Sequence, residues 1–383
     1  NIIGWGASGR NGGQIWNDVA WGIDSIEKKY GLKHAMQLWN ISQAAVDLID
    51  ERIKNFNIEC DKKSGGIHAA TSLSKFKEYE NDLKYKLKTY NYDKLEVLDK
   101  ATVDHEIGSS LYYGGILDRG AGHLHPLKYA IGLMNAALSL GVNVYENSPA
   151  KKILQNSTDI EVLIENGKVN AKKIAVCCNA YIEGLNLGIE NKVMPCETYI
   201  VCTEPLNIDL QQNILPNDYC VSDTNFDLNY YRLSESKRMI FGGAVGYSLK
   251  NVEGLKKRTK KQLNRVFPQL KNIKVDYIWG GLIAITVNRV PDIGMINEKI
   301  FYAQGFSGHG VAFTGIAGKI LAENIVSGKT SEMEAFEKIK HRNFPGGRLF
   351  RMPLLVTISA MQRMMDIFNA VSYTHLRAHE TSA

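Results

Sequence analysis

The feature that most constrains this sequence is a glycine-rich segment at residues 305–311, Gly-Phe-Ser-Gly-His-Gly-Val. Before it, residues 300–303 are apolar or small, which predicts a short buried strand. After it, small and apolar residues recur every three or four positions over residues 311–326, and Gly328 predicts where this helix ends. Glycines let a backbone approach a ligand closely, and a helix N-terminus carries partial positive charge. The segment predicts either a cofactor-binding turn or an ordinary strand-to-helix connection.

Composition is that of a globular protein. The 383 residues are 44% hydrophobic and 22% charged, which is enough apolar material for two or three buried cores. The net charge of +6 is spread along the chain, and the densest basic run, residues 256–261, contains no aromatic residue. Nucleic-acid binding favours aromatics interleaved with basic charge, so we expect no nucleic-acid partner.

The six cysteines form no Cys-x-x-Cys pair and no His/Cys cluster at metal-ligand spacing. This pattern favours free thiols in a cytoplasmic protein and argues against a metal site. No apolar run approaches the roughly 18 residues that a membrane-spanning helix needs. Residues 346–368 carry an apolar stripe, which we interpret as a C-terminal helix packed on the protein rather than an interfacial membrane helix.

The N-terminal region contains a formal Gly-x-Gly-x-x-Gly match at residues 4–9. Three residues precede it, too few for the strand that a dinucleotide-binding turn requires, so we interpret the match as coincidental. The polar loop at residues 7–14 is more informative, because its glycines, Ser8 and Arg10 could contact phosphates. A long helix is expected from Gln14 to about residue 56, with a break near Gly31.

Further along, the texture alternates between α/β and β-rich regions. A helix is predicted to begin at Pro126, and strands at residues 142–145 and 152–154, followed by a hairpin at Asn166-Gly167. Residues 191–289 predict an antiparallel sheet. This order indicates one domain interrupted by another: residues 1–55, 120–190 and 290–345 form the first, and residues 56–119 and 191–289 the second.

Several segments occur in a characteristic order: Ala-Ser-Gly-Arg-Asn-Gly-Gly-Gln at 7–14, Gly-His-Leu-His-Pro at 122–126, Asn-Tyr-Tyr-Arg-Leu at 229–233, Phe-Gly-Gly at 241–243, Pro-Asp-Ile-Gly at 291–294 and Gly-Phe-Ser-Gly-His-Gly at 305–310. Together they resemble the FAD-dependent amine and amino-acid oxidoreductases of the D-amino-acid oxidase, glycine oxidase and sarcosine oxidase superfamily, most closely its gamma-glutamylputrescine oxidoreductase branch. The resemblance implies an α/β fold, with a glutathione-reductase-like FAD-binding domain interrupted by an antiparallel-sheet α+β substrate domain.

Both ends depart from this family. Its first strand, true Gly-x-Gly-x-x-Gly turn and acidic ribose-binding residue are absent, so we expect an N-terminally truncated FAD-binding domain that binds FAD poorly or not at all. Residues 372–381 break the earlier patterning, and residues 369–383 are expected to be a non-native disordered tail.

The resemblance also implies which residues contact noncovalently bound FAD, since Ile285 stands near the position of the tethering cysteine found in some members. These are Ser8, Arg10, Asn11, Gly12, Gly13, Gln14, Lys152, Ile153, Gly308, His309, Gly310 and Val311. Candidates for lining the substrate pocket are Tyr231, Arg232, Asn288 and His309. Each could instead be structural, and one of Tyr230 and Tyr231 should pack in a core because they alternate along a strand.

The family's carboxylate anchors are missing, because Ile283 and Ala312 stand where other members carry an arginine or a lysine. The resemblance therefore implies oxidation of an amine, gamma-glutamylputrescine or a similar polyamine derivative, to an imine and aldehyde by hydride transfer to flavin N5. Oxygen or another acceptor would reoxidise the flavin. The alternatives are an oxidase or dehydrogenase of glycine, sarcosine or a D-amino acid, and an inactive flavin-fold binding module. The sequence predicts no oligomeric state.

Overall fold

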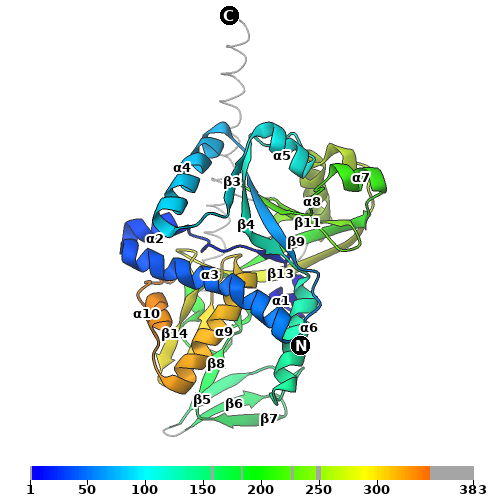
Figure 1. The fold of residues 1–383 in the computed structure, drawn as a ribbon. Coiled ribbons are helices and arrows are strands. Elements are labelled where there is room, and N and C mark those ends of the chain that lie inside the picture. The colour runs from blue at the N-terminus through cyan, green and yellow to red at the C-terminus, as the bar shows by residue number, and fades with distance from the viewer. Residues whose placement is uncertain (1, 157–158, 183, 226–227, 247–251, 346–383) are drawn as a thin grey trace, which may run out of the picture.

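The computed structural model describes residues 2–156, 159–182, 184–225, 228–246 and 252–345 (Figure 1). The fold is mixed α/β, as expected, and its largest element is a nine-stranded sheet. The predicted helix at residues 346–368 and tail at residues 369–383 lie outside the described residues.

The large sheet has the order β1-β4-β2-β10-β11-β12-β9-β13, and β3 pairs with β4. Its neighbouring strands are antiparallel except β2 and β10, which run parallel. The strands are β1 (Gln14–Ile15), β2 (Lys63–Ala69), β3 (Leu95–Leu98), β4 (Gly115–His123), β9 (Val193–Pro205), β10 (Cys220–Asp223), β11 (Tyr230–Leu233), β12 (Arg238–Gly246) and β13 (Val275–Thr286).

Two smaller sheets lie in the lower half of Figure 1. One has the order β14-β15-β8, with β15 and β8 parallel, and the other is the antiparallel β5-β6-β7. Their strands are β5 (Lys152–Gln155), β6 (Ile160–Ile164), β7 (Gly167–Ala171), β8 (Ile174–Val176), β14 (Asp292–Asn297) and β15 (Ile300–Gln304). The α-helices are α1 (Ala7–Arg10), α2 (Ile23–Tyr30), α3 (Leu32–Asn55), α4 (Leu73–Tyr90), α5 (Lys100–Ile107), α6 (Pro126–Ser139), α7 (Ile208–Asn213), α8 (Val252–Val266), α9 (Gly310–Ser327) and α10 (Ser331–Glu337).

Separate hydrophobic cores stabilise these layers. The first packs α3, α9 and α10 against β14 and β15, with Trp39, Phe313 and Phe336 at its centre. The second covers one face of the large sheet and contains Tyr231 and Phe267, while the third joins β8 and β15 to β13. The predicted boundaries of an FAD-binding domain and a substrate domain stay a prediction.

Elements defined by local patterns are confirmed. The buried strand β15 and helix α9 flank the glycine-rich turn, and Gly328 ends α9 with a positive φ of 87°. Gly31 separates α2 from α3, and Pro126 is the first residue of α6. Gly315 lets α9 approach α3, where Arg52 Nη2 donates to its carbonyl oxygen over 3.3 Å.

Elements formed by long-range pairing were predicted less well. The expected helix from Gln14 is wrong at its start, because Gln14 and Ile15 pair with His123 and Gly122 as strand β1, and α2 begins only at Ile23. The strand expected at residues 142–145 is absent from the structure, where Tyr145 is 76% exposed.

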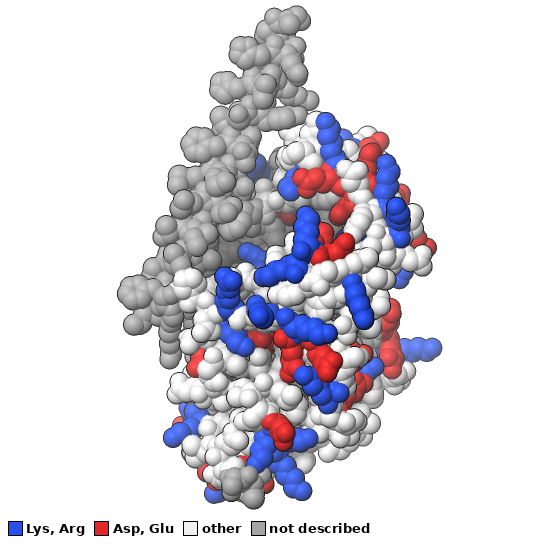
Figure 2. Space-filling model, turned by 90° about the vertical axis from the view of Figure 1, so that its left-hand side faces the viewer, with Lys and Arg blue, Asp and Glu red and all other residues white. Residues whose placement is uncertain are grey.

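The surface mixes both signs of charge, as Figure 2 shows for one face. Surface ion pairs such as Lys100–Asp104 and Lys168–Glu161 join residues of opposite charge. Within the described ranges no helix is long and apolar enough to span a bilayer. The same residues contain no group of three or more potential metal-ligating side chains.

Candidate functional site

The glycine-rich turn leaves β15 at Gly305 and enters α9 at Gly310. Gly305, Ser307 and Gly308 have positive φ values of 72°, 51° and 97°. Such values suit glycine and strain other residues, and a Cβ on Gly305 would overlap the Thr286 methyl group. A Cβ on Gly308 would have no atom within 4 Å, so the backbone of the turn is open at this point.

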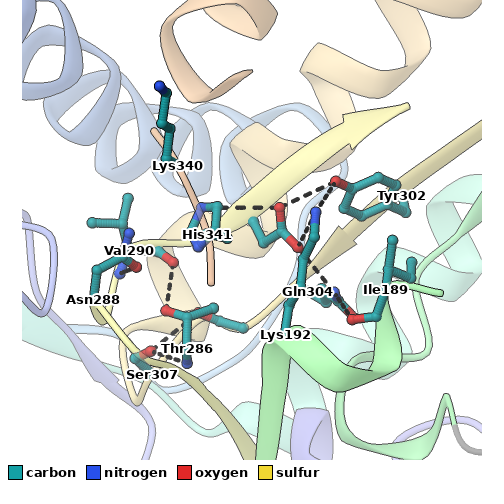
Figure 3. Close-up of polar contacts among 12 residues, drawn as sticks. Ile189, Lys192, Thr286, Asn288, Val290, Tyr302, Gln304, Ser307, Lys340 and His341 are labelled. Carbon is teal, nitrogen blue, oxygen red and sulfur yellow. Dashed lines mark hydrogen bonds and ion pairs between the residues drawn. The ribbon is translucent and has the colours of Figure 1, made fainter. Parts of the chain in front are cut away.

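A buried polar cluster supports this turn from behind (Figure 3). Asp292, 3% exposed, accepts hydrogen bonds from Tyr302 (3.1 Å) and from Gln304 (3.0 Å), and Gln304 also donates to the Ile189 carbonyl oxygen (2.9 Å). Lys192 Nζ and His341 Nε2 lie 3.6 and 3.9 Å from the carboxylate. This network fixes the end of β15, from which the turn begins.

Two polar atoms near the turn, His309 Nδ1 and Asn288 Nδ2, are buried without a hydrogen-bond partner among the described residues. Burial, with a contribution from the nearby Arg289, lowers the pKa of His309 to about 4. The imidazole is therefore neutral at neutral pH. Unsatisfied buried polar groups carry a free-energy cost that a polar ligand could remove.

The polar loop before β1 is held by its own side chains. Asn11 donates to the carbonyl oxygens of Ala7 (2.9 Å) and Ser8 (3.2 Å) and accepts from Gly13 N (2.7 Å). Gln14 donates across the sheet to the carbonyl oxygens of Val221 (2.8 Å) and Tyr231 (3.3 Å). Asn11 and Gln14 are both predicted cofactor contacts, and their side-chain amides already donate hydrogen bonds within the protein.

The remaining predicted cofactor residues lie in three places. Ser8 and Arg10 are exposed on α1, where Arg10 Nη1 reaches the Gly280 carbonyl oxygen over 3.3 Å. Gly308, His309, Gly310 and Val311 form the turn and the start of α9. Lys152 and Ile153 lie in β5 of a separate sheet.

Arg232 holds the polar loop and also lines a hollow beside it, together with Gly9, Asn11 and His125. It is 4% exposed, and its guanidinium donates to the carbonyl oxygens of Gly12 (2.6 Å), Leu124 (3.0 Å) and Leu233 (3.1 Å). Burial lowers its pKa to about 10. That Arg232 lines the substrate pocket stays a prediction, and its donors are directed at backbone carbonyls.

The expectation that Tyr231 lines the pocket is corrected. It is 1% exposed in the second core, its ring stacks on Phe241 at 5.5 Å, and its hydroxyl donates to that of Tyr112 over 3.0 Å. Of the two adjacent tyrosines, Tyr231 is the one that packs in a core. Its neighbour Tyr230 lies on the opposite face of β11, since side chains alternate along a strand.

That opposite face carries a row of side chains that the sequence analysis did not single out. Strands β2, β10, β11 and β12 each contribute one residue in register, namely His68, Ser222, Tyr230 and Gly242. The Tyr230 ring lies where a Cβ on Gly242 would overlap it and 2.9 Å from the position of a Cβ on Gly12. The row therefore faces the polar loop, and His309 is close enough to His68 to affect its pKa.

The two positions compared with known carboxylate anchors differ in setting. Ala312 is 1% exposed inside the first core, so its small side chain reflects packing and does not describe a pocket. Ile283 is half-buried on β13. Of the two positions behind the expectation about missing anchors, Ile283 alone remains informative about a pocket.

Comparisons with known proteins agree with this architecture. The model of the DAO family, described as "FAD dependent oxidoreductase", matches residues 1–324. The chain is 38% identical over 365 residues to gamma-glutamylputrescine oxidoreductase of Escherichia coli (strain K12), covering 95% of this chain and 85% of that protein. It is also 38% identical over 353 residues to the probable oxidoreductase OrdL of Haemophilus influenzae, covering 91% of this chain and 81% of that protein.

Solved structures share the fold at low sequence identity. Glycine oxidase from Geobacillus kaustophilus matches with a TM-score of 0.74 at 17% identity, covering 90% of this chain and 91% of the other. L-proline dehydrogenase from P. horikoshii matches with a TM-score of 0.68 at 20% identity, covering 80% and 84%.

Proposed function

Because this chain belongs to the family of FAD-dependent oxidoreductases, we propose that it oxidises an aliphatic amine whose reacting carbon bears no carboxylate, such as gamma-glutamylputrescine. The substrate class is supported by the 38% identity of this chain to gamma-glutamylputrescine oxidoreductase of Escherichia coli. It is also supported by the half-buried Ile283, since the resemblance implies an arginine at this position in relatives that act on amino acids.

The observation that carries this proposal is the charge of the row on the large sheet. His68, Ser222, Tyr230 and Gly242 include no permanent cation. Arg232 lies on the same face of β11, but its guanidinium donates to three backbone carbonyl oxygens. Lys86 is near His68 but lies 3.6 Å from Asp18, and Asp82 and Asp118 also favour its charged form. A carboxylate next to the reacting carbon would need a cationic partner, whereas an amine needs only hydrogen-bond acceptors.

The residues present fit FAD at the glycine-rich turn. His309 Nδ1 and Asn288 Nδ2 have unused hydrogen-bonding capacity there, and the backbone is open at Gly308. The N-terminus of α9 begins at Gly310 and adds partial positive charge. We infer that this turn, with the backbone of Gly12 and Gly13, contacts the ring system. Ser8 and Arg10 are proposed phosphate contacts, and Lys152 and Ile153 contacts to the adenine.

Bound FAD would supply the two-electron acceptor for the hydride that leaves the amine-bearing carbon. The protein's own contribution is to hold the amine between the row and the turn and to limit access of water. Tyr230 provides a rigid wall, since its ring is confined between Gly12 and Gly242. Neutral His309 places no fixed positive charge against the substrate's amino group. We further propose that oxygen or another acceptor reoxidises the flavin.

The test uses the complete gene product, loaded with FAD and kept anaerobic. Gamma-glutamylputrescine and putrescine are compared with glycine, sarcosine and D-alanine, and flavin bleaching is followed in the visible spectrum. We expect bleaching by the amines and at most slow bleaching by the amino acids. Bleaching by the amino acids alone would favour an amino-acid oxidase or dehydrogenase.

A protein that takes up no FAD would instead be an inactive binding module of the same fold. We also infer a cytoplasmic location, which is supported by the free thiols of all six cysteines.

A further inference from the structure

We propose that His68 receives the substrate's amino group through its Nε2 atom, and that Ser222 and Trp16 fix the imidazole ring for this role. The inference rests on the proposed amine oxidation and adds the residue that selects for an amine. It concerns hydrogen bonding and orientation, so it requires no covalent step.

The orientation of the His68 ring is set by two contacts. Its Nδ1 lies 2.9 Å from Ser222 Oγ, and its plane packs on Trp16 with ring centroids 3.9 Å apart at 31°. Trp16 is itself held, because its Nε1 donates to Gln14 Oε1 over 3.1 Å. A Cβ on Gly66 would come within 2.8 Å of the indole, so the indole lies directly over β2. Such fixed surroundings are typical of a preorganised binding group.

The position of His68 in the sheet places it on the substrate side. Its neighbours Ile67 and Ala69 are fully buried in the second core, so His68 projects from the other face of β2. There it stands in register with Ser222, which in turn pairs with Tyr230. His68 is half-buried. Since Ser222 holds Nδ1, Nε2 at the other edge of the ring remains directed away from the sheet partner.

The electrostatic environment keeps this ring neutral. Burial, with Lys86 and His309 adding to it, lowers the pKa of His68 to about 3. From α4, Lys86 faces a carboxylate of Asp18, with Asp82 and Asp118 nearby. From the turn, His309 is also neutral and lies near Arg289. We assign to His68 the tautomer in which Nδ1–H donates to Ser222 Oγ, and in this tautomer Nε2 presents a lone pair that can accept an N–H group.

A neutral acceptor of this kind fits an aliphatic amine and does not fit a carboxylate. An alkylammonium group has a pKa near 10, so a base as weak as His68 cannot take its proton. The proton must leave to solvent before the amine becomes reactive. His68 then accepts one N–H bond and leaves the nitrogen lone pair free for formation of the C=N bond.

The experiment compares His68→Leu, His68→Gln and Ser222→Ala with wild type in the FAD-loaded complete protein, with His105→Gln on α5 as the matched control. Anaerobic stopped-flow reduction by gamma-glutamylputrescine gives the substrate Kd and the limiting rate, and flavin fluorescence gives the affinity for FAD. We expect His68→Leu to raise the substrate Kd about tenfold, which corresponds to one lost hydrogen bond to a polar ligand. His68→Gln should restore part of this loss, and Ser222→Ala should raise the Kd about threefold. FAD affinity should stay unchanged throughout.

A pH series separates an acceptor from a base. The reduction rate should rise towards the amine's own pKa with the same apparent pKa in wild type and His68→Gln. A different apparent pKa in the variant, or a substrate Kd that His68→Leu and Ser222→Ala leave at the wild-type value, overturns the inference. If His68→Leu does not fold, the other two variants decide. Wild-type flavin that no amine reduces would refute the proposed function itself, which is a separate outcome.

Discussion

Behind the glycine-rich turn, Asp292 is 3% exposed and four side chains converge on its carboxylate: Lys192, Tyr302, Gln304 and His341. On the large sheet, His68 is half-buried and is held at one ring nitrogen by Ser222. The Asp292 cluster stabilises the glycine-rich turn and His68 belongs to the large sheet, and the turn and the sheet both border the same candidate site. A buried carboxylate with this many partners fixes local geometry, because moving it would break several bonds together. A ring held at one edge keeps its other edge for a ligand.

This difference separates residues that position the site from residues that contact what binds there. Burial of polar groups alone does not distinguish the two, since both clusters contain histidine with a lowered pKa. The distinguishing observation concerns the two central groups: both carboxylate oxygens of Asp292 accept hydrogen bonds within the protein, whereas His68 is bonded at one ring nitrogen. Arg232 illustrates this point, because its guanidinium is buried near the polar loop but donates to three backbone carbonyls.

The largest expected effect is on stability, at the Asp292 cluster. Asp292→Ala removes the acceptor of Tyr302 and Gln304 and leaves Lys192 without its nearby carboxylate. We expect the free energy of unfolding to fall by about 3 kcal/mol, the usual cost of breaking a buried polar network. Chemical denaturation measures this fall. Substrate Kd in the fraction that retains FAD should stay near the wild-type value.

The control for this prediction is Glu96→Ala, which removes the partner of Arg119 in an exposed pair with side chains 51% and 58% exposed. It should change stability little, because solvent screens surface ion pairs. Equal losses in Asp292→Ala and Glu96→Ala would mean that the cluster contributes no more than a surface pair.

A smaller effect is expected from the two adjacent tyrosines on β11. Tyr230→Phe removes a hydroxyl on the face of the row that also bonds Thr198. We expect the rate of flavin reduction by the substrate to fall about fivefold, which corresponds to about 1 kcal/mol. Tyr231→Phe removes the bond to Tyr112, so it should lower stability by about 1 kcal/mol without changing kinetics. Stopped-flow reduction and denaturation on both variants test the assignment. The reverse pattern would exchange the roles of the two faces.

These tyrosines also show how far sequence reasoning reaches. The alternation along residues 229–233 required that one tyrosine pack in a core, and Tyr231 does. Which of them it is depends on what covers each face: Phe241 and Phe267 on one side, Gly12 and Gly242 on the other. Those neighbours come from distant segments, so a local pattern contains no information about them.

The turn and the row differ in the same respect. The segment at residues 305–311 was predictable, because a buried strand, three glycines and a helix follow one another in the chain. His68, Ser222 and Trp16 come together only through the pairing of β2 with β10 and the placement of the loop after β1. Strand β1 was expected to be helical, since two residues paired with β4 leave no periodic signal.

The smallest expected effect is the pH dependence of stability, and it tests whether the histidines of the two clusters differ. Histidine in the unfolded chain has a pKa near 6.5, whereas the folded pKa values of His68 and His309 are about 3 and about 4. Between these limits the unfolded chain binds more protons, so stability is full above about pH 6.5 and falls as the pH is lowered towards the folded pKa values. Allowing for partial exposure of the rings, each should contribute about 1 kcal/mol of loss between pH 7 and pH 5.

At His341, burial lowers the pKa and Lys192 adds to this, but Asp292 acts in the opposite direction. Replacing His309 with glutamine should therefore flatten the fall in melting temperature below pH 6.5 more than replacing His341 does. Thermal melts of both variants from pH 8 to pH 5 measure this, and a steeper dependence on His341 would show that the cluster behind the turn, rather than the site, senses acid.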